Sequence, residues 1–259
     1  SEPDDPIVIQ QWHYKQRFAL EADRLSRKLL KSLTERGIDI SEDGFQDDFY
    51  PGPADFITPP EAVSRLENDW IALDLEPSTC SVTSMRLKAP GLVFSPGDGN
   101  FFQLYHMQGS DRHNLKSVSG GRISGLMRKN GCQQLMMSGS APSCSEYHLC
   151  LRIPDDRQEL ELAVCLDKRA IRTKESIHLA FPFELAAGTL SYDGAGTWID
   201  PQKDFLKVAC RNFFCPQRRV RISSPQTMVT VTIKDNPLIE ISRITAEEPW
   251  LKTTPPGTR

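Results

Sequence analysis

Apolar and polar residues alternate along most of the chain after residue 70. In residues 159–167 the apolar side chains fall at every second position: Leu160, Leu162, Val164 and Leu166. Because successive side chains of a strand point to opposite faces, this alternation predicts a half-buried strand. Residues 176–183 repeat the pattern and are predicted to form a second strand.

Turn signals separate these segments from one another. Asp193-Gly194 marks one turn, and an Asp-Asn-Pro sequence at residues 235–237 marks another. Many short strands with no helix between them are typical of an antiparallel β-sandwich. Further predicted strand segments are residues 70–77, 80–87, 100–107 and 228–242, the last holding two strands around its turn.

A different period occurs near the start of the chain. Apolar residues recur there at steps of three and four, which predicts an amphipathic helix over residues 7–36. Asp5 and Pro6 suit its first turn, and Gly37 suits its end. The short apolar stripe favours packing on a neighbouring domain over a coiled coil. The stripe consists of Phe18, Ala22, Leu25, Leu29 and Leu33.

These patterns divide the chain into four predicted segments. Residues 1–40 form a helical segment, and residues 41–69 form an acidic, proline-rich linker without a sustained period. Residues 70–250 form the β-sandwich region, and residues 251–259 form a flexible tail. The predicted fold class is therefore mostly β, an antiparallel β-sandwich preceded by an N-terminal helical segment.

The composition is ordinary for a globular protein, with 39% hydrophobic and 25% charged residues. The net charge of −3 argues against a nucleic-acid partner, although Arg218, Arg219 and Arg221 form a small basic patch. No apolar run approaches the roughly 18 residues that span a bilayer, and residues 1–10 lack the features of a signal peptide. We therefore expect no membrane partner.

The seven cysteines are an odd number, so at least one thiol is not paired within the chain. Their spacings are irregular, and no Cys-x-x-Cys occurs. We expect reduced cysteines that behave as small apolar residues. This favours a reducing compartment and a cytoplasmic location.

A zinc site is the first candidate chemistry, because thiolates and imidazoles are zinc ligands. Cys132, Cys144, His148 and Cys150 lie close together in the sequence. Their spacings match no standard ligand pair, so we expect no metal and no cofactor in this chain.

Glycoside hydrolysis is the second candidate chemistry. It needs two carboxyl groups flanking the bond that breaks. The adjacent pairs Asp47-Asp48 and Asp155-Asp156 both lie in polar turns, where aspartate is usually solvated or caps a backbone group. No Gly-x-Ser-x-Gly elbow or phosphate-binding loop is present, and residues 194–196 are predicted to form a hairpin turn. No catalytic residue is assigned.

A sugar site is the third candidate chemistry. Aromatic rings stack on sugar rings, and planar side chains such as arginine clamp hydroxyl groups. The candidate substrate-binding residues are Arg218, Gln217, Trp198 and Tyr192. In the alternative interpretation, Trp198 caps the sandwich and Gln217 with Arg218 belongs to a hydrogen-bonded surface strand.

Two structural expectations concern charged residues near these strands. If Val220 packs in the core, alternation predicts that Arg218 is buried and bonded to a carboxylate or carbonyl, while Arg219 is exposed. Glu175 precedes an apolar strand. A salt bridge from Glu175 to Lys174 or Arg172 is favoured over an acid–base role.

Two motifs in the second half of the chain carry a family resemblance. Lys174-Glu175 leads into an apolar strand that ends in Phe181-Pro182-Phe183, and Gln217-Arg218 leads to Val220. The pair resembles the C-terminal β-domain of the α-mannosidase family of glycoside hydrolases (family thirty-eight). Arg219 stands where that family has Trp. The resemblance covers residues 70–245.

The resemblance implies a galactose-mutarotase-like β-sandwich that is associated with carbohydrate, specifically mannosides. The family's catalytic aspartate and zinc ligands belong to an N-terminal barrel that nothing in this sequence matches. Zinc is therefore expected only in a full family enzyme. The chain is expected to be an accessory region, non-catalytic alone, beside a barrel-containing catalytic region or subunit. Two alternatives stay open: a stand-alone glycan-binding module, and a structural or interaction relic of a hydrolase.

Overall fold

The computed structural model describes residues 31, 63–97, 99–109, 112–206, 212–234, 238–241 and 244. The chain divides into two units, Ser1–Asp48 and Phe49–Arg259. Lys31, which is helical, is the one described residue of the first unit. The rest of the predicted helix, most of the predicted linker and the predicted tail lie outside the described residues. The fold below is that of the second unit.

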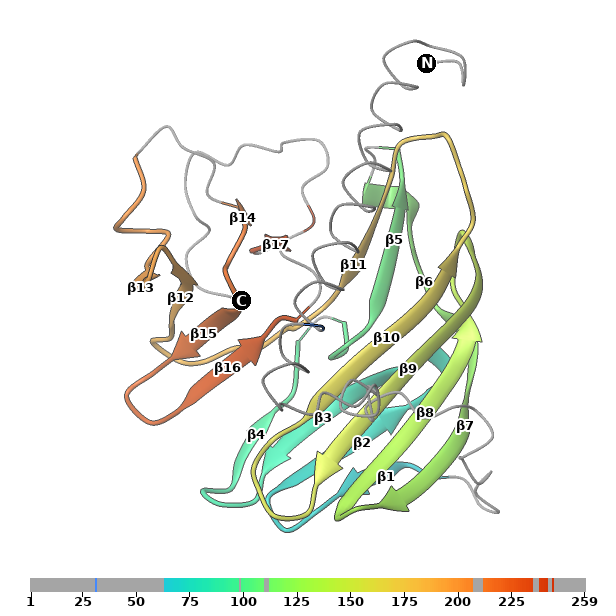
Figure 1. The fold of residues 1–259 in the computed structure, drawn as a ribbon, viewed down its shortest axis with the longest axis horizontal. Helices are drawn as coiled ribbons and strands as arrows, with labels where there is room; N and C mark the ends of the chain where they lie inside the picture. Colours follow the sequence, from blue (N-terminus) through green and yellow to red (C-terminus); the bar gives the residue numbers. More distant parts are fainter. Residues whose placement is uncertain are drawn as a thin grey trace. The chain divides into compact units, whose positions relative to one another are not determined.

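Antiparallel strands make up most of the described part of this unit (Figure 1). Two four-stranded sheets are meanders in which strands consecutive in sequence are neighbours, because short turns connect them. The first sheet contains β1 (Arg65–Glu67), β2 (Ile71–Glu76), β3 (Ser81–Leu87) and β4 (Leu92–Phe94). The second sheet, in the order β10-β9-β8-β7, contains β7 (Ser119–Lys129), β8 (Cys132–Ser140), β9 (Cys144–Pro154) and β10 (Glu161–Lys168).

Three smaller sheets complete the described strands. The third sheet, in the order β11-β5-β6, contains β5 (Leu104–Gln108), β6 (Leu115–Ser117) and β11 (Glu175–Leu179). The fourth, in the order β13-β12-β15-β16, contains β12 (Thr189–Gly194), β13 (Thr197–Ile199), β15 (Arg219–Ser223) and β16 (Met228–Thr232). The last pairs β14 (Phe213–Phe214) with β17 (Ile239–Glu240). Two 3₁₀ turns are η3 (Pro77–Thr79) and η4 (Arg112–Asn114).

One apolar core lies between the inner faces of the first two sheets. Leu73 and Val82 from the first sheet and Leu149 and Leu151 from the second are all fully buried in the same cluster. Leu104 of the third sheet joins them. Away from the register shifts in these sheets, every second residue of the strands points into the core. The prediction of a mostly β, antiparallel sandwich is confirmed.

A second, smaller core lies under the fourth sheet. Tyr192, Phe214 and Ile241 are its buried members. Leu190 of β12 packs against both this cluster and the main core. The fourth sheet is therefore attached to the sandwich through apolar contacts, and its opposite face is left for polar residues.

Two details differ from the sequence-based expectation. Strand β1 lies within residues 41–69, the predicted linker. It is only three residues long with one buried residue, Leu66, so its alternation is too short to detect. The two strands predicted within residues 228–242 exist as β16 and β17, but they belong to different sheets. The turn residues between these two segments indicated a turn but not which strand each segment pairs with.

No helix in the described part of the chain has the length and apolar character needed to cross a membrane.

Candidate functional site

Trp198 and Tyr192 lie on the neighbouring strands β13 and β12, but on opposite faces of the fourth sheet. Trp198 pairs with Asp193, so these two side chains lie on the same face of the sheet. Tyr192 directly precedes Asp193, so its side chain points to the opposite face. Tyr192 is 5% exposed, and its ring centre lies 5.1 Å from that of Phe214 in the smaller core. The structure therefore does not bring Tyr192 to the surface that carries Trp198.

The turn between these two strands fixes where Trp198 stands. Ala195 and Gly196 both have positive φ angles, 49° and 79°. Two such residues in succession fit the twist of a tight hairpin. The predicted hairpin turn at residues 194–196 is confirmed, and it places Trp198 directly beside Asp193.

Gln217 and Arg218 are exposed and immediately precede β15. Their backbone amides donate to Asp193, at 2.9 Å to its carbonyl and 2.8 Å to its Oδ1. No side-chain hydrogen bond or ion pair of Arg218 occurs among the described residues. The prediction that Arg218 is buried and bonded is wrong. The strand begins at Arg219, so the alternation of β15 does not extend to Arg218.

Asp193 is the polar centre of this region. Its Oδ1 accepts from the backbone amides of Arg218 and Arg219, and its Oδ2 accepts from Arg219 Nε at 3.2 Å. Burial by itself would raise the pKa of this carboxyl, but these donors outweigh burial and lower the pKa. Asp193 is therefore held as a carboxylate that ties the start of β15 to β12.

Two arginines stack on Trp198. The guanidinium carbon of Arg221 lies 3.9 Å from the indole ring centre, and that of Arg219 lies 5.1 Å from it. Both distances are within the range of cation–π attraction. Arg219 and Arg221 are two residues apart on β15 and so share its outer face. We call Trp198, Asp193, Arg219 and Arg221 the Trp198 face.

Hydroxyl groups border the Trp198 face on both sides. Ser191 of β12 and Thr230 of β16 are the pairing partners of Arg221, and Thr232 is the partner of Arg219. Paired residues share a face of the sheet, so these hydroxyls stand beside the two guanidinium groups. The sequence pattern indicated a small basic patch and an exposed Arg219, but not the stacking of the two arginines on Trp198. The pairing of β15 with β12, which brings both arginines to Trp198, is not encoded in the local pattern.

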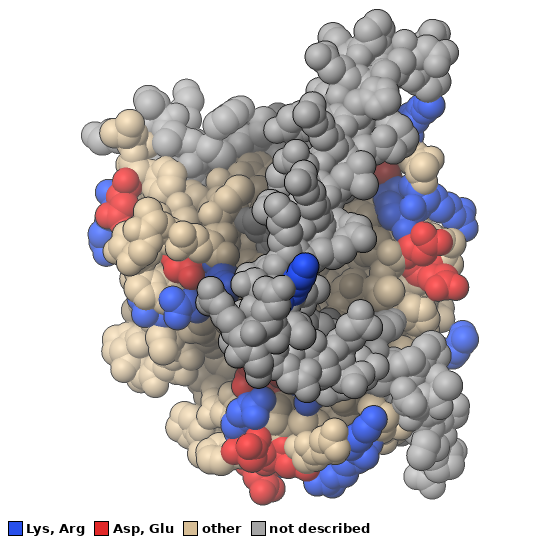
Figure 2. All heavy atoms as spheres, viewed as in Figure 1, with Lys and Arg blue, Asp and Glu red and all other residues tan. Residues whose placement is uncertain are grey.

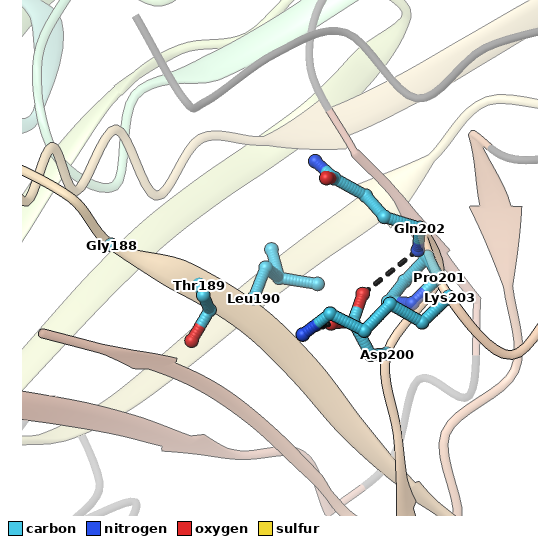
Figure 3. Close-up of a pocket in the computed structure, with 7 residues that line it drawn as sticks. All are labelled: Gly188, Thr189, Leu190, Asp200, Pro201, Gln202 and Lys203. Atoms are coloured by element: carbon cyan, nitrogen blue, oxygen red, sulfur yellow. Dashed lines mark hydrogen bonds and ion pairs between the residues drawn. The ribbon is translucent and has the colours of Figure 1, made fainter.

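A small cavity lies next to this region, between β12 and the turn that follows β13 (Figure 3). Its volume is about 150 Å³, which is below the roughly 300–1,000 Å³ of typical ligand pockets. Asp200 already binds the Gln202 amide at 2.8 Å and Lys203 Nζ at 3.0 Å, so its charge is used within the turn. The cavity offers little to a ligand of its own.

Ser143, His106 and Glu175 have the residue types of a hydrolase triad, but their geometry excludes that role. His106 Nε2 lies 3.0 Å from Ser143 Oγ and 2.8 Å from Glu175 Oε2. In a triad the acid binds the other ring nitrogen, Nδ1. Here Nδ1 is buried without a hydrogen bond, and His106 is 3% exposed. One nitrogen cannot serve both partners during proton transfer, so the group is structural.

Glu175 is the charged centre of this buried group. Lys168 Nζ binds its Oε1 at 2.5 Å. Hydrogen bonds from Lys168 and then His106 lower the pKa of Glu175 to about 2. A structural salt bridge was expected at Glu175, but its partner is Lys168 of β10 rather than Lys174 or Arg172.

The four residues weighed as zinc ligands do not come together. Cys144 lies in the main core, while His148, on the opposite face of β9, binds Ser138 Oγ at 2.8 Å. Cys132 Sγ lies 3.3 Å from a guanidinium nitrogen of Arg152. Among the described residues, no group of three or more potential ligands can hold a metal ion. The six described cysteines carry free thiols.

Several charged side chains elsewhere form ion pairs with one another. Asp155, of the predicted turn pair, binds Arg128 at 2.9 Å, and Asp47-Asp48 lies outside the described residues. On the side drawn in Figure 2, blue and red atoms occur next to each other in small groups over a mainly tan described surface. The Trp198 face, where two arginines stack on one tryptophan, is the candidate functional site in the described structure.

Comparison with known proteins adds no relative: no protein-family model and no curated protein matches the chain. The resemblance to the α-mannosidase family thus rests on the sequence motifs given above.

Proposed function

We propose that this chain is the accessory β-sandwich region of an α-mannosidase-like glycoside hydrolase. The observation that carries the proposal is the position of the Phe-Pro-Phe motif. Phe183 is 4% exposed, and its ring centre lies 4.9 Å from that of Phe101 and 5.5 Å from that of Phe94. The family-like motif therefore holds the third and first sheets together.

The second motif supports the same proposal. Gln217 and Arg218 form the entry to β15, where their amides bind Asp193. Both motifs thus act on the sandwich itself rather than on a reacting group. In this proposal the catalytic aspartate and the zinc ion belong to a barrel-containing region or subunit, and the chain binds no metal of its own.

Carbohydrate, specifically a mannoside, is the proposed ligand. Trp198 with Arg219 and Arg221 forms the candidate contact surface, and Ser191 and Thr230 supply neighbouring hydroxyls. Gln217 and Arg218 are exposed beside this surface. Tyr192 takes no part, because its ring is in the smaller core.

The test is isolation of the natural gene product with an antibody raised against this chain. We expect either a chain much longer than 259 residues or a complex with a separate subunit. In both cases the product should hydrolyse aryl α-mannosides in a zinc-dependent way. The purified 259-residue chain should hydrolyse none. A natural product of 259 residues, without activity or an associated subunit, would contradict the proposal.

A stand-alone glycan-binding module is the second candidate. The observation that favours it is that one sheet supplies the whole Trp198 face, which therefore needs no second domain. Binding of the isolated chain to immobilised glycans, lost in Trp198→Ala, would select this function. The structural or interaction relic would bind no glycan and show no hydrolase activity in any complex.

A further inference from the structure

Arg221 occupies one face of the Trp198 ring, so that face is not open to a sugar. The guanidinium carbon lies 3.9 Å from the ring centre, which is stacking distance. A pyranose that stacked on the same face would have to displace a desolvated cation from it. Trp198 thus holds Arg221 in a fixed orientation.

The guanidinium of Arg221 keeps its donors. No hydrogen bond or ion pair of this side chain occurs among the described residues. Its Nε is buried, so its Nη groups are the donors left for a ligand. Stacking uses the flat face of the guanidinium and leaves the N–H groups in its plane. These groups form a planar fork that matches the oxygens of a phosphate or a sulfate.

The charges of the Trp198 face do not cancel. Asp193 is the one carboxylate in the set, and its oxygens already bind the start of β15 and Arg219 Nε. Its side chain is 13% exposed, whereas that of Arg219 is 52% exposed. Arg219 therefore presents its outer N–H groups beside those of Arg221. The exposed Arg218 adds a third positive charge next to the pair.

We propose that the Trp198 face binds the anionic substituent of a glycan, a phosphate or sulfate ester. The guanidinium groups of Arg221 and Arg219 hold the ester oxygens, while Ser191 and Thr230 lie where sugar hydroxyls can reach them. Trp198 is a positioning residue that acts through Arg221. The inference rests on the proposed carbohydrate function and adds the class of the ligand. A neutral sugar would leave the stacked guanidinium of Arg221 without an anion.

Calorimetric titration of the full chain at low salt tests this proposal. The probes are mannose 6-phosphate, mannose and inorganic phosphate. We expect mannose 6-phosphate to bind measurably more tightly than either of the others. Raising the salt from 20 to 300 mM should weaken binding, because screening acts over about 10 Å at 0.1 M salt.

Variants of Arg221 separate charge from geometry. Arg221→Gln should weaken binding about tenfold or more, since it removes charged hydrogen bonds. Arg221→Lys keeps the charge without the planar fork and should restore only part of the affinity. Trp198→Phe, which keeps a smaller ring under Arg221, should weaken binding less than Arg221→Gln.

The matched control is Arg128→Gln on β7. Arg128 is an exposed arginine paired with Asp155, so this variant should bind as wild type does.

Each outcome decides a different part of the proposal. Equal affinity for mannose and mannose 6-phosphate would overturn the anionic ligand and leave the carbohydrate function intact. Equal affinity for inorganic phosphate and mannose 6-phosphate would leave an anion site without a glycan and also overturn it. If Arg221→Gln does not fold, the guanidinium NMR signals of the wild-type chain replace it. Those of Arg219 and Arg221 must shift on titration, and unchanged signals would refute the proposal.

Discussion

Asp193 shows how one carboxylate organises a strand entry. It accepts from the backbone amides of Arg218 and Arg219 and from the Arg219 side chain. Asp193→Ala leaves these amides without their acceptor, which typically costs about 1–3 kcal/mol of unfolding free energy. Urea unfolding of the variant measures this loss.

The control for Asp193 is Asp156→Ala. The Asp156 side chain is 76% exposed and its contact with Arg157 is 3.5 Å long, so this change should stay within about 0.5 kcal/mol. Equal effects of the two substitutions would mean that water replaces the contacts of Asp193.

Tyr147 presents the opposite case, a buried polar atom without a partner. Its residue is 1% exposed, and its hydroxyl has no hydrogen bond in the described structure. Burial raises the pKa of this phenol, so the group stays neutral. Tyr147→Phe removes an unsatisfied hydroxyl and keeps the ring. We expect equal or greater stability in urea, by up to about 1 kcal/mol.

Tyr105→Phe is the comparison for that change. The Tyr105 hydroxyl donates to Gln103 Oε1 at 3.0 Å, and losing this bond should cost about 1 kcal/mol. A clear loss of stability in Tyr147→Phe would show that its hydroxyl has an acceptor after all.

At the scale of elements, the Glu175 group links β11 to β10 and β5 and makes stability depend on pH. The pKa of a glutamate carboxyl is ordinarily near 4.5, whereas the pKa of Glu175 in the folded protein is about 2. A carboxyl with a lowered pKa stabilises the fold fully above its unfolded value. That contribution is lost as the pH falls from about 4.5 through 2.

Glu175→Gln should therefore be less stable than wild type at neutral pH, and the two should converge as the pH falls toward 2. Thermal melts between pH 7 and pH 2.5 measure the slopes. Glu146→Gln, whose side chain is 74% exposed, controls for the loss of one charge. Parallel curves for wild type and Glu175→Gln would refute the role of this group.

A close approach between β7 and η3 depends on Gly121. A Cβ atom there would lie 2.1 Å from the carbonyl oxygen of Pro77 and 2.8 Å from Cys80 Sγ. Both neighbours are held by the fold, so Gly121→Ala should destabilise by about 1–3 kcal/mol. A Cβ at Gly97 meets no atom within 4 Å, and Gly97→Ala is the matched control. Denaturant midpoints that shift equally would contradict this packing.

These elements also show what the sequence could and could not predict. Strand β10 was identified from its alternation, because a half-buried strand leaves a local signature. Arg218 was misplaced because the predicted strand included Gln217, whereas β15 begins at Arg219. Asp193 was missed as a partner because its contacts join segments 25 and 26 residues apart. Lys168 lies only seven residues before Glu175, but on a different sheet, so their contact depends on how the sheets pack. Sheet order and ion-pair partners depend on such contacts, which a local pattern does not encode.

At the scale of the whole described unit, the fourth sheet contributes side chains to both apolar cores. Ile222 of β15 belongs to the main core, while Tyr192 of the adjacent strand β12 belongs to the smaller one. Leu190 packs against both. Because the same sheet contributes to both cores, loosening one core removes support from the other. We therefore expect residues 63–241 to unfold as one cooperative unit.

Two core substitutions in the full chain test this cooperativity. Leu149→Ala, in the main core at 0% exposure, should cost about 2–5 kcal/mol, and Phe214→Ala, in the smaller core at 4%, about 3–5 kcal/mol. Each should shift the urea transitions seen by circular dichroism and by tryptophan fluorescence together, since Trp198 is on the fourth sheet and Trp70 directly precedes β2 of the first sheet. Val93→Ala, at a residue 44% exposed, should shift neither by much. Phe214→Ala could instead move the fluorescence transition and leave the circular dichroism transition in place. The fourth sheet would then unfold separately, and the two cores would not be coupled.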